Sequence, residues 1–172
     1  ECDESTDPTN TGQLTASTGC VGGATISYSD VVTAGSCANS YTIERTWAVT
    51  DGCGGNETHI QTITVEDNTA PVVVCGVASD VINTVGGSAS LPNYITGATI
   101  NDNCSANGSL VTTQTPSAGT VLTAGSYSVT IESVDECGNV GSCTINVTVN
   151  NNEVITVTNS PANVTIECDE ST

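Results

Sequence analysis

The sequence of 172 residues contains no lysine and a single arginine, Arg45, against 19 aspartates and glutamates, which gives a formal charge of -18. A protein that binds nucleic acid needs Lys and Arg side chains to neutralise phosphates and release their counterions. Binding to an anionic membrane surface needs the same side chains. The composition therefore argues against nucleic acid and anionic lipid as partners.

The sequence also lacks phenylalanine, methionine and long apolar runs. Its longest apolar stretches, such as Pro71–Cys75, are far shorter than the roughly 20 residues that span a bilayer, so we expect no membrane insertion. Hydrophobic residues still make up 37% of the chain, which is too many for a disordered acidic segment. We therefore expect a folded protein, and the length fits two domains of roughly 70 to 90 residues.

Nine cysteines are spread along the chain and never form the C-x-x-C pairs that zinc sites favour. Such a spread favours a disulfide framework, which predicts an extracellular or cell-surface location. The odd number leaves one cysteine over, which suggests that it pairs beyond this chain. The nine are Cys2, Cys20, Cys37, Cys53, Cys75, Cys104, Cys137, Cys143 and Cys168.

Polar and apolar residues alternate in several short runs, for example Tyr41–Val49 and Tyr127–Ile131. This period of two is typical of half-buried strands, and no window shows a helical stripe. Short strands separated by Gly, Asn, Asp and Pro at regular spacing predict an all-β sandwich.

The two halves of the chain contain the same succession of motifs. Thr33–Ser36, a strand and Asp51–Asn56 are echoed by Thr123–Ser126, a strand and Asp135–Asn139. Each succession is followed by a closing strand. The chain therefore holds two related domains, joined near Glu66–Pro71.

A second repeat has a longer period, because Glu1–Thr6 recurs letter for letter as Glu167–Thr172. The simplest interpretation is that the chain is one period of a tandem array. The first domain begins directly at a cysteine and lacks the segment that precedes Cys75 in the second domain. The tail of the chain then contains this missing segment for the next copy. We expect this inter-repeat strand to be formed around Val154, Val157, Val164 and Ile166.

These motifs resemble the hyalin-repeat (HYR) family of immunoglobulin-like domains. The second domain carries the likeness in Ala70–Cys75, Asn101–Cys104, Thr115–Gly119 and Asp135–Asn139. The first, with Cys2–Gly12 and Thr42–Trp47, is similar to the variant found in large bacterial surface adhesins, gliding-motility adhesins included. The resemblance implies two tandem immunoglobulin-like β-sandwich domains and no catalytic role. Their expected extents are residues 1–69 for a variant domain without its own first strand, 70–150 for an HYR-like domain, and 151–172 for the linker and first strand of the next copy.

The family pattern and the duplication together suggest which cysteines pair. They imply Cys104 with Cys137 and Cys75 with Cys143, and by correspondence Cys20 with Cys53. Because His59 stands near the position that Cys143 holds in the second domain, Cys2 is left with Cys37. Cys168 would pair with the next copy's equivalent of Cys37.

The acidic residues lack cations within the chain, and several should gather where the linker meets the second domain. In an immunoglobulin-like sandwich, the loops that carry Cys104 and Cys137 meet at that pole. Carboxylate and amide oxygens in such a cluster suit Ca²⁺, and the linker also looks like the calcium-binding linkers of cadherins. The alternative is that these are solvated, turn-forming residues. The candidate ligands are Glu66, Asp67, Asn68, Asp102, Asp135 and Glu136.

No catalytic motif is present: there is no Gly-x-Ser-x-Gly elbow, no His-Glu-x-x-His and no phosphate-binding loop, so we expect no enzyme. We predict instead a structural repeat of an extracellular bacterial surface fibre or adhesin, whose partners are identical repeats joined head to tail and a cell-surface or glycan target. Successive copies could be covalent, or separate subunits in which residues 153–172 donate a strand. The alternative function is a carbohydrate- or ligand-binding module. Trp47 is expected in the core, with an exposed, sugar-stacking ring as the alternative.

Overall fold

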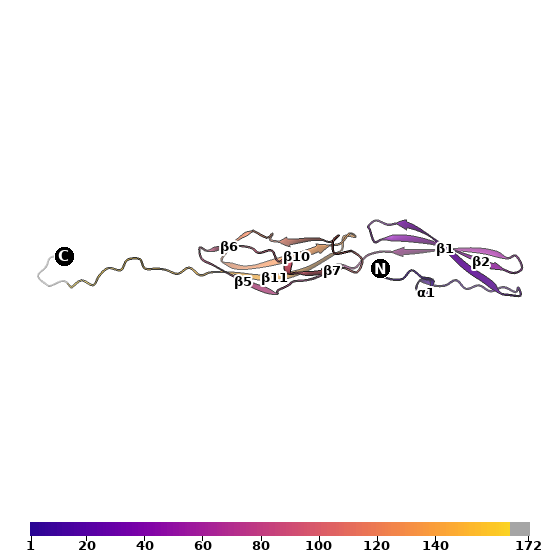
Figure 1. Cartoon of the computed structure of the whole chain (residues 1–172), viewed down its shortest axis with the longest axis horizontal. Helices are drawn as coiled ribbons and strands as arrows, with labels where there is room; N and C mark the ends of the chain where they lie inside the picture. The colour runs from indigo at the N-terminus through magenta and orange to yellow at the C-terminus, as the bar shows by residue number, and fades with distance from the viewer. Residues whose placement is uncertain (166–172) are drawn as a thin grey trace.

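The computed structural model describes residues 1–165 and is elongated (Figure 1). Two groups of strands lie end to end, and the C-terminal segment extends away from the second group. We call residues 1–65 the N-terminal unit and residues 72–151 the C-terminal unit. Apart from two single-turn helices, all regular structure in the described chain is β, which confirms the all-β class.

The N-terminal unit contains one antiparallel sheet with the order β1-β2-β3. Its strands are β1 (Ala24–Ala34), β2 (Tyr41–Asp51) and β3 (Asn56–Val65). Because β2 is central and alternates apolar with polar residues, one of its faces is buried, with Ile43, Arg45 and Trp47 at 5% exposure or less. The opposite face is rich in Ser and Thr, such as Thr46 and Thr62, and is open to solvent.

The first 23 residues cover the buried face of this sheet without forming a strand. Their only helix is the single turn α1 (Pro8–Thr11). The sequence pattern predicts a sandwich here, but within the described chain this unit has one sheet. The reason is compositional, because this segment offers only Leu14 and Val21 as large apolar residues and so lacks the alternation that a second sheet needs.

Arg45 fastens this covering segment to the sheet. Its guanidinium is 2% exposed and donates hydrogen bonds to both carboxylate oxygens of Asp30, at 2.8 and 2.9 Å. Two further N–H groups donate to the Thr11 hydroxyl and the Thr6 carbonyl, each at 2.9 Å. The guanidinium also lies over the ring of Tyr28, 4.5 Å from its centroid. The only arginine of the chain is therefore an internal connector.

Trp47 is a core residue, as predicted. Its ring is 5% exposed, and its indole N–H donates to the Gln61 side chain at 3.0 Å. Because so little of the side chain is exposed, Trp47 offers no platform for a sugar.

The C-terminal unit is built on a four-stranded sheet with the order β5-β11-β10-β8. The strands are β5 (Ser79–Thr84), β8 (Val111–Thr115), β10 (Gly125–Val134) and β11 (Val140–Asn151). The β10–β11 and β8–β10 pairs are antiparallel, whereas β5 runs parallel to β11.

Two small sheets pack against this large one. The first pairs β4 (Val72–Val74) with β7 (Thr99–Asn101), and the second pairs β6 (Ser88–Ser90) with β9 (Val121–Thr123). A short 3-10 helix, η1 (Ile95–Gly97), lies between β6 and β7. Between the layers is the hydrophobic core, formed by Leu91, Leu122, Val129, Ile131, Ile145, Val147 and Val149.

The tail from Asn152 to Thr165 forms no strand and is exposed (Figure 1). The expected inter-repeat residues Val154, Val157 and Val164 are 84%, 75% and 78% exposed. Ile166 and Cys168 lie outside the described residues. No helix in the part of the chain that the structure describes has the length and hydropathy to cross a membrane.

Candidate functional site

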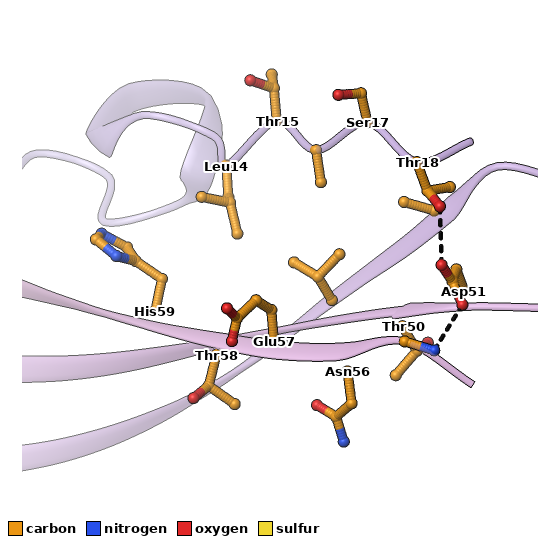
Figure 2. A pocket seen from close by; sticks show the side chains of 14 residues that line it. Leu14, Thr15, Ser17, Thr18, Thr50, Asp51, Asn56, Glu57, Thr58 and His59 are labelled. Carbon is orange, nitrogen blue, oxygen red and sulfur yellow. Dashed lines mark hydrogen bonds between the residues drawn. The ribbon is translucent and has the colours of Figure 1, made fainter. Parts of the chain in front are cut away.

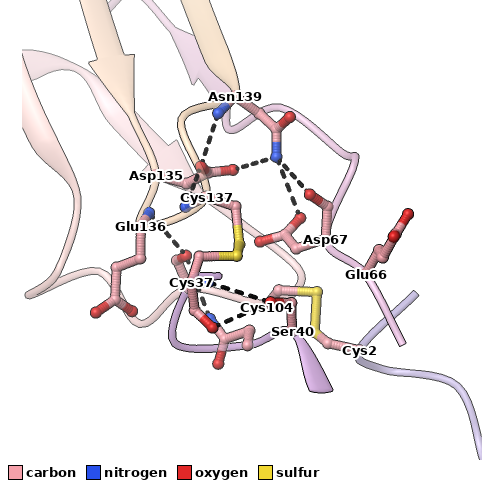
Figure 3. The surroundings of a disulfide bond; sticks show 12 residues. Cys2, Cys37, Ser40, Glu66, Asp67, Cys104, Asp135, Glu136, Cys137 and Asn139 are labelled. Carbon is pink, nitrogen blue, oxygen red and sulfur yellow. Dashed lines mark hydrogen bonds between the residues drawn. A yellow bond between two sulfur atoms is a disulfide. The ribbon is translucent and has the colours of Figure 1, made fainter. Parts of the chain in front are cut away.

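The chemistry-bearing residues gather at the junction between the two units (Figure 3). The N-terminus, the β1–β2 loop and the linker 66–71 meet two loops of the C-terminal unit there. Hydrogen bonds cross the junction from Asn139 to the Asp67 carbonyl at 2.9 Å and from Asn103 to Asp3 at 3.3 Å. A longer contact joins Asn39 to Ser105 at 3.5 Å.

Two disulfides cross this junction. Cys2 bonds Cys104, with 5.7 Å between the Cα atoms, and Cys37 bonds Cys137, with 5.0 Å between them. Both Cα separations are in the usual range for disulfides. Together with the linker, the two units are thus joined by three covalent connections.

These bonds correct two of the predicted pairings. Cys20–Cys53 and Cys75–Cys143 are confirmed, but Cys2–Cys37 and Cys104–Cys137 are wrong. The prediction assumed that each unit closes its own loops, as the Cys20–Cys53 pair does. In the fold, the chain start and the β1–β2 loop both reach the pole of the C-terminal unit, so each brings a cysteine to a partner in the other unit.

Three aspartates form a cluster beside these bridges. Asp67 of the linker and Asp102 and Asp135 of the C-terminal unit each place a carboxylate oxygen within 4.8 Å of the others. Asp67 is 4% and Asp135 6% exposed, and Asp102 is half-buried. These are three of the six predicted ligands, brought together from three separate segments.

Backbone N–H groups hold the cluster in place. Asp135 accepts the N–H groups of Cys137 and Asn139, each at 2.8 Å, and its second oxygen accepts the Asn139 side chain. One oxygen of Asp102 accepts the N–H groups of Cys104 and Ser105 at 2.9 and 2.7 Å. These bonds explain why short Asp-x-Cys loops recur in the sequence, since Asp favours such turns.

Two buried oxygens of the cluster have no hydrogen-bond partner among the described residues. They are Oδ2 of Asp67 and Oδ1 of Asp102. A buried, unpartnered carboxylate oxygen is costly, because burial removes its water without replacing it.

The electrostatics of Asp67 reflect this crowding. Burial raises the pKa of its carboxyl group above the usual value, and the negative charges of Asp135, Asp102 and Glu1 raise it further. The N–H of Thr69 acts in the opposite direction. No Lys, Arg or His lies in the cluster to offset the three charges.

The other three predicted ligands stay outside the cluster. Glu66, Asn68 and Glu136 are exposed, and Figure 3 shows the carboxylates of Glu66 and Glu136 directed away from Asp67. Glu1 is not among the predicted ligands, yet its carboxylate accepts the N–H of Asn68 at 3.3 Å. Its distance along the chain from the linker left no local signal.

The far pole of the N-terminal unit has the same loops with different chemistry. Thr18 stands two residues before Cys20, as Asp102 stands before Cys104, and its hydroxyl oxygen accepts the Cys20 N–H at 3.2 Å. That hydroxyl donates to Asp51, the equivalent of Asp135, at 2.8 Å. One carboxylate is therefore paired with a neutral donor there, whereas three carboxylates face one another at the junction.

The donor chemistry of the junction cluster fits a hard divalent cation. Asp67, Asp102 and Asp135 offer only oxygen, and two of those oxygens are buried and unpartnered. Ca²⁺ prefers such ligands. The cysteines near the cluster are disulfide-bonded and offer no thiolate.

A groove of about 580 Å³ lies at the far pole of the N-terminal unit (Figure 2). The segment Leu14–Thr18 forms one wall and the start of β3, Asn56–His59, forms the other. Figure 2 shows Leu14 directed into the groove and the Thr18–Asp51 hydrogen bond closing one end.

Comparisons with solved structures find extracellular cadherin-type proteins at low similarity. The structure described as "PcdhgB3 EC1-4 in 50 mM HEPES" has a TM-score of 0.28 and 11% identity, and the match covers 74% of this chain and 41% of that one. The structure of the protocadherin GammaB4 extracellular domain has a TM-score of 0.32 and 15% identity, with 73% and 26% covered. The chain thus spans less than half the length of either structure.

No curated protein matches the sequence. A family model does match: that of the HYR domain, over residues 66–149, which include the linker and nearly all of the C-terminal unit. This match confirms the resemblance predicted from the motifs of the second half: residues 66–149 are similar to the HYR domain.

Proposed function

We propose that this chain is a structural repeat of an extracellular surface fibre or adhesin of bacterial type, joined head to tail to identical repeats. The observation that carries the proposal is the pair of disulfides across the junction, Cys2–Cys104 and Cys37–Cys137. Three covalent connections between two units resist bending and twisting far better than one linker. Such a joint suits a load-bearing spacer.

An extracellular location is supported by two observations. The described residues contain four disulfides, which persist in oxidising compartments. The HYR match points to the same kind of extracellular module. The chain's charge of -18, repeated along an array, would keep neighbouring fibres apart and soluble.

The location and assembly can be tested on cells of the source organism. We expect antibodies against this chain to label intact, unpermeabilised cells and filaments shed from them. Labelling only after permeabilisation would contradict the proposal. Intact mass under denaturing, reducing conditions then separates the two forms of assembly, because a species near 17.3 kDa means separate subunits and a much larger one means a covalent array.

We also propose that the cluster of Asp67, Asp102 and Asp135 binds Ca²⁺ and stiffens the junction further. The support is the pair of buried oxygens without partners and the absence of a neighbouring cation within the described cluster. Bound Ca²⁺ would be coordinated by both unpartnered oxygens, and its charge would offset the repulsion that raises the pKa of Asp67. The rest of its coordination would come from water or backbone carbonyls.

The far pole supplies a matched control for this site. The variant Asp102→Thr recreates the Thr18 arrangement, in which the hydroxyl still accepts the cysteine N–H. We expect calorimetry to show one Ca²⁺ site in the native chain and none in Asp102→Thr, and EDTA to lower the melting temperature of the native chain only. A native melting temperature unmoved by EDTA, with no heat of Ca²⁺ binding, would exclude the site.

A further inference from the structure

We propose that Val154–Ile166 of a preceding copy completes the N-terminal unit, filling the groove of Figure 2 and adding a parallel strand to the free edge of β3. The inference rests on the proposed head-to-tail repeat and names where each copy receives the tail of the preceding copy. It follows from comparing the two units of the same chain.

The sheets of the two units correspond strand by strand. The β2–β3 hairpin turns at Asp51 and Cys53, and the β10–β11 hairpin turns at Asp135 and Cys137. In both turns the aspartate accepts the cysteine N–H, at 3.0 and 2.8 Å. Thus β1, β2 and β3 take the places of β8, β10 and β11. The C-terminal sheet has a fourth strand, β5, parallel to β11, while the described N-terminal sheet has none beside β3.

The groove corresponds to the seat of β4. In the C-terminal unit, β4 pairs with β7, which ends three residues before Cys104, and it packs on the start of β11. The packing is close, since a Cβ on Gly141 would overlap the carbonyl of Pro71. The counterparts in the N-terminal unit are the segment ending at Ser17, three residues before Cys20, and the start of β3. These are the two walls of the groove.

The walls are unpaired and partly apolar. Residues 12–18 form no strand, so their backbone can accept a partner, as β7 accepts β4. Leu14, Ala16, Ala24 and Val49 line the groove beside its polar residues. In the C-terminal unit the corresponding position is filled by Val73 of β4, which packs against the core.

The tail of the chain has the strands that the N-terminal unit lacks. It carries two apolar stretches in the order of β4 and β5, one at Val154–Val157 and one at Val164–Ile166. The valines of both stretches are at least 75% exposed in the structure, with no partner among the described residues. Exposed apolar strands of this kind bind to open sheet edges.

The two ends of the chain set the direction of the added strand. Because Glu1–Thr6 recurs as Glu167–Thr172, the residue before Glu1 in a head-to-tail array is Ile166 of the preceding copy. Glu1 lies just past the end of β3, where its carboxylate accepts the N–H of Asn68. A segment that reaches this point from the far pole runs parallel to β3, as β5 runs parallel to β11.

The test is to append a copy of residues 153–166 in front of Glu1 of the full chain. We expect amide hydrogen exchange to slow at least about tenfold in Thr15–Ser17 and in β3, because both gain hydrogen-bonded partners. The control carries the same extension with four substitutions in the appended copy. They are Val154→Ser, Val157→Ser, Val164→Ser and Ile166→Ser.

Equal exchange in the native and the serine extension would overturn the inference, including the case in which neither slows. A second variant tests the receiving side: Ala16→Trp, at an exposed position of the groove wall, should block the slowing in Thr15–Ser17. Slowing that persists in Ala16→Trp would overturn the assignment of the groove.

The outcome is separable from that of the proposed function. If cells carry the protein on surface filaments but the extension protects nothing, the strand addition is wrong and the fibre stands. If the extension protects the groove and β3 but no surface protein is found, the strand addition stands and the fibre is wrong.

Discussion

Removing the two junction disulfides should uncouple the two units, and Trp47 reports the effect. The perturbation is the chain in which Cys2, Cys37, Cys104 and Cys137 are all changed to Ser. The N-terminal unit then depends on its own small core, in which the buried apolar side chains are Ile43, Trp47 and Val65. The C-terminal unit keeps a core of seven buried residues and its own Cys75–Cys143 bond.

The expected loss follows from the loops that the bridges close. Cys2–Cys104 and Cys37–Cys137 have sequence separations of 102 and 100 residues. A loop of this size contributes about 4 to 5 kcal/mol in the chain-entropy model. One kcal/mol shifts the melting temperature of a small domain by about 4 to 8 °C, so loss of one bridge alone predicts a fall of roughly 15 to 40 °C, and the four-serine variant loses both bridges.

Tryptophan fluorescence reports the unfolding of the N-terminal unit alone, because Trp47 is the only tryptophan in the chain and lies in β2. We expect its transition to move to lower temperature in the four-serine variant while the β-sheet circular dichroism keeps a second, higher transition. The matched control, Cys75→Ser with Cys143→Ser, should lower the circular dichroism transition and leave that of Trp47 nearly unmoved. An unmoved Trp47 transition in the four-serine variant would refute the reasoning.

Three further predictions concern single side chains. Asp30→Asn leaves the buried Arg45 without its carboxylate partner and should lower the free energy of unfolding, measured in urea, by about 2 kcal/mol. This loss is smaller than for a fully buried pair, because Asp30 is partly exposed. An unchanged urea midpoint would contradict this. The hydrogen bond from Thr18, and then those from Gly55 and Cys53, hold the pKa of Asp51 below 3.8, so the contribution of Asp51 to stability is present above that pH and is lost as the pH falls through the lowered pKa. In an acid titration followed by Trp47 fluorescence, Asp51→Asn should therefore reduce the loss of stability at low pH. An identical loss in the native chain and the variant would rule this out. Gly141→Val should displace β4 and speed amide exchange in Val72–Val74, because a side chain at this position would overlap the carbonyl of Pro71. The control Gly138→Ala, at a turn with a positive φ and no neighbour within 4 Å, should leave β4 protected. Unchanged exchange in β4 of Gly141→Val would show that Gly141 does not set the position of β4.

The acidic cluster was predictable because its members lie in the linker or close to a cysteine. Asp67 lies in the linker, and Asp102 and Asp135 each precede a cysteine by two residues, so a sandwich topology suffices to bring the three together. What the pattern left open was which carboxylates turn inward. Glu66 and Glu136 are each adjacent to a cluster member, and their direction depends on the local turn.

The disulfide pairing was predictable only within a unit. Cys20–Cys53 and Cys75–Cys143 follow from strand order, because each joins elements of one unit. The pairings of Cys2 and Cys37 depend on how two poles meet, which no periodicity records. The single sheet of the N-terminal unit was missed for a related reason, because the motif alignment carried over a sandwich whose first strands are absent from the segment before β1.

The two poles of the N-terminal unit imply two kinds of joint in a fibre. At the junction, Cys2 and Cys37 cross to the neighbouring unit. At the far pole, Cys20 and Cys53 bond each other and Thr18 replaces the acidic residue, so no described cysteine is left there to cross-link a preceding copy. In the proposed array, joints within a copy are therefore locked, and joints between copies depend on the added strand. If Cys168 follows Cys2, its partner is the next copy's equivalent of Cys104, which locks the junction inside that copy rather than the joint between the two copies.

We expect electron micrographs of single fibres to show bends spaced one copy apart. Bends at every unit boundary would mean that the junction disulfides do not stiffen the chain.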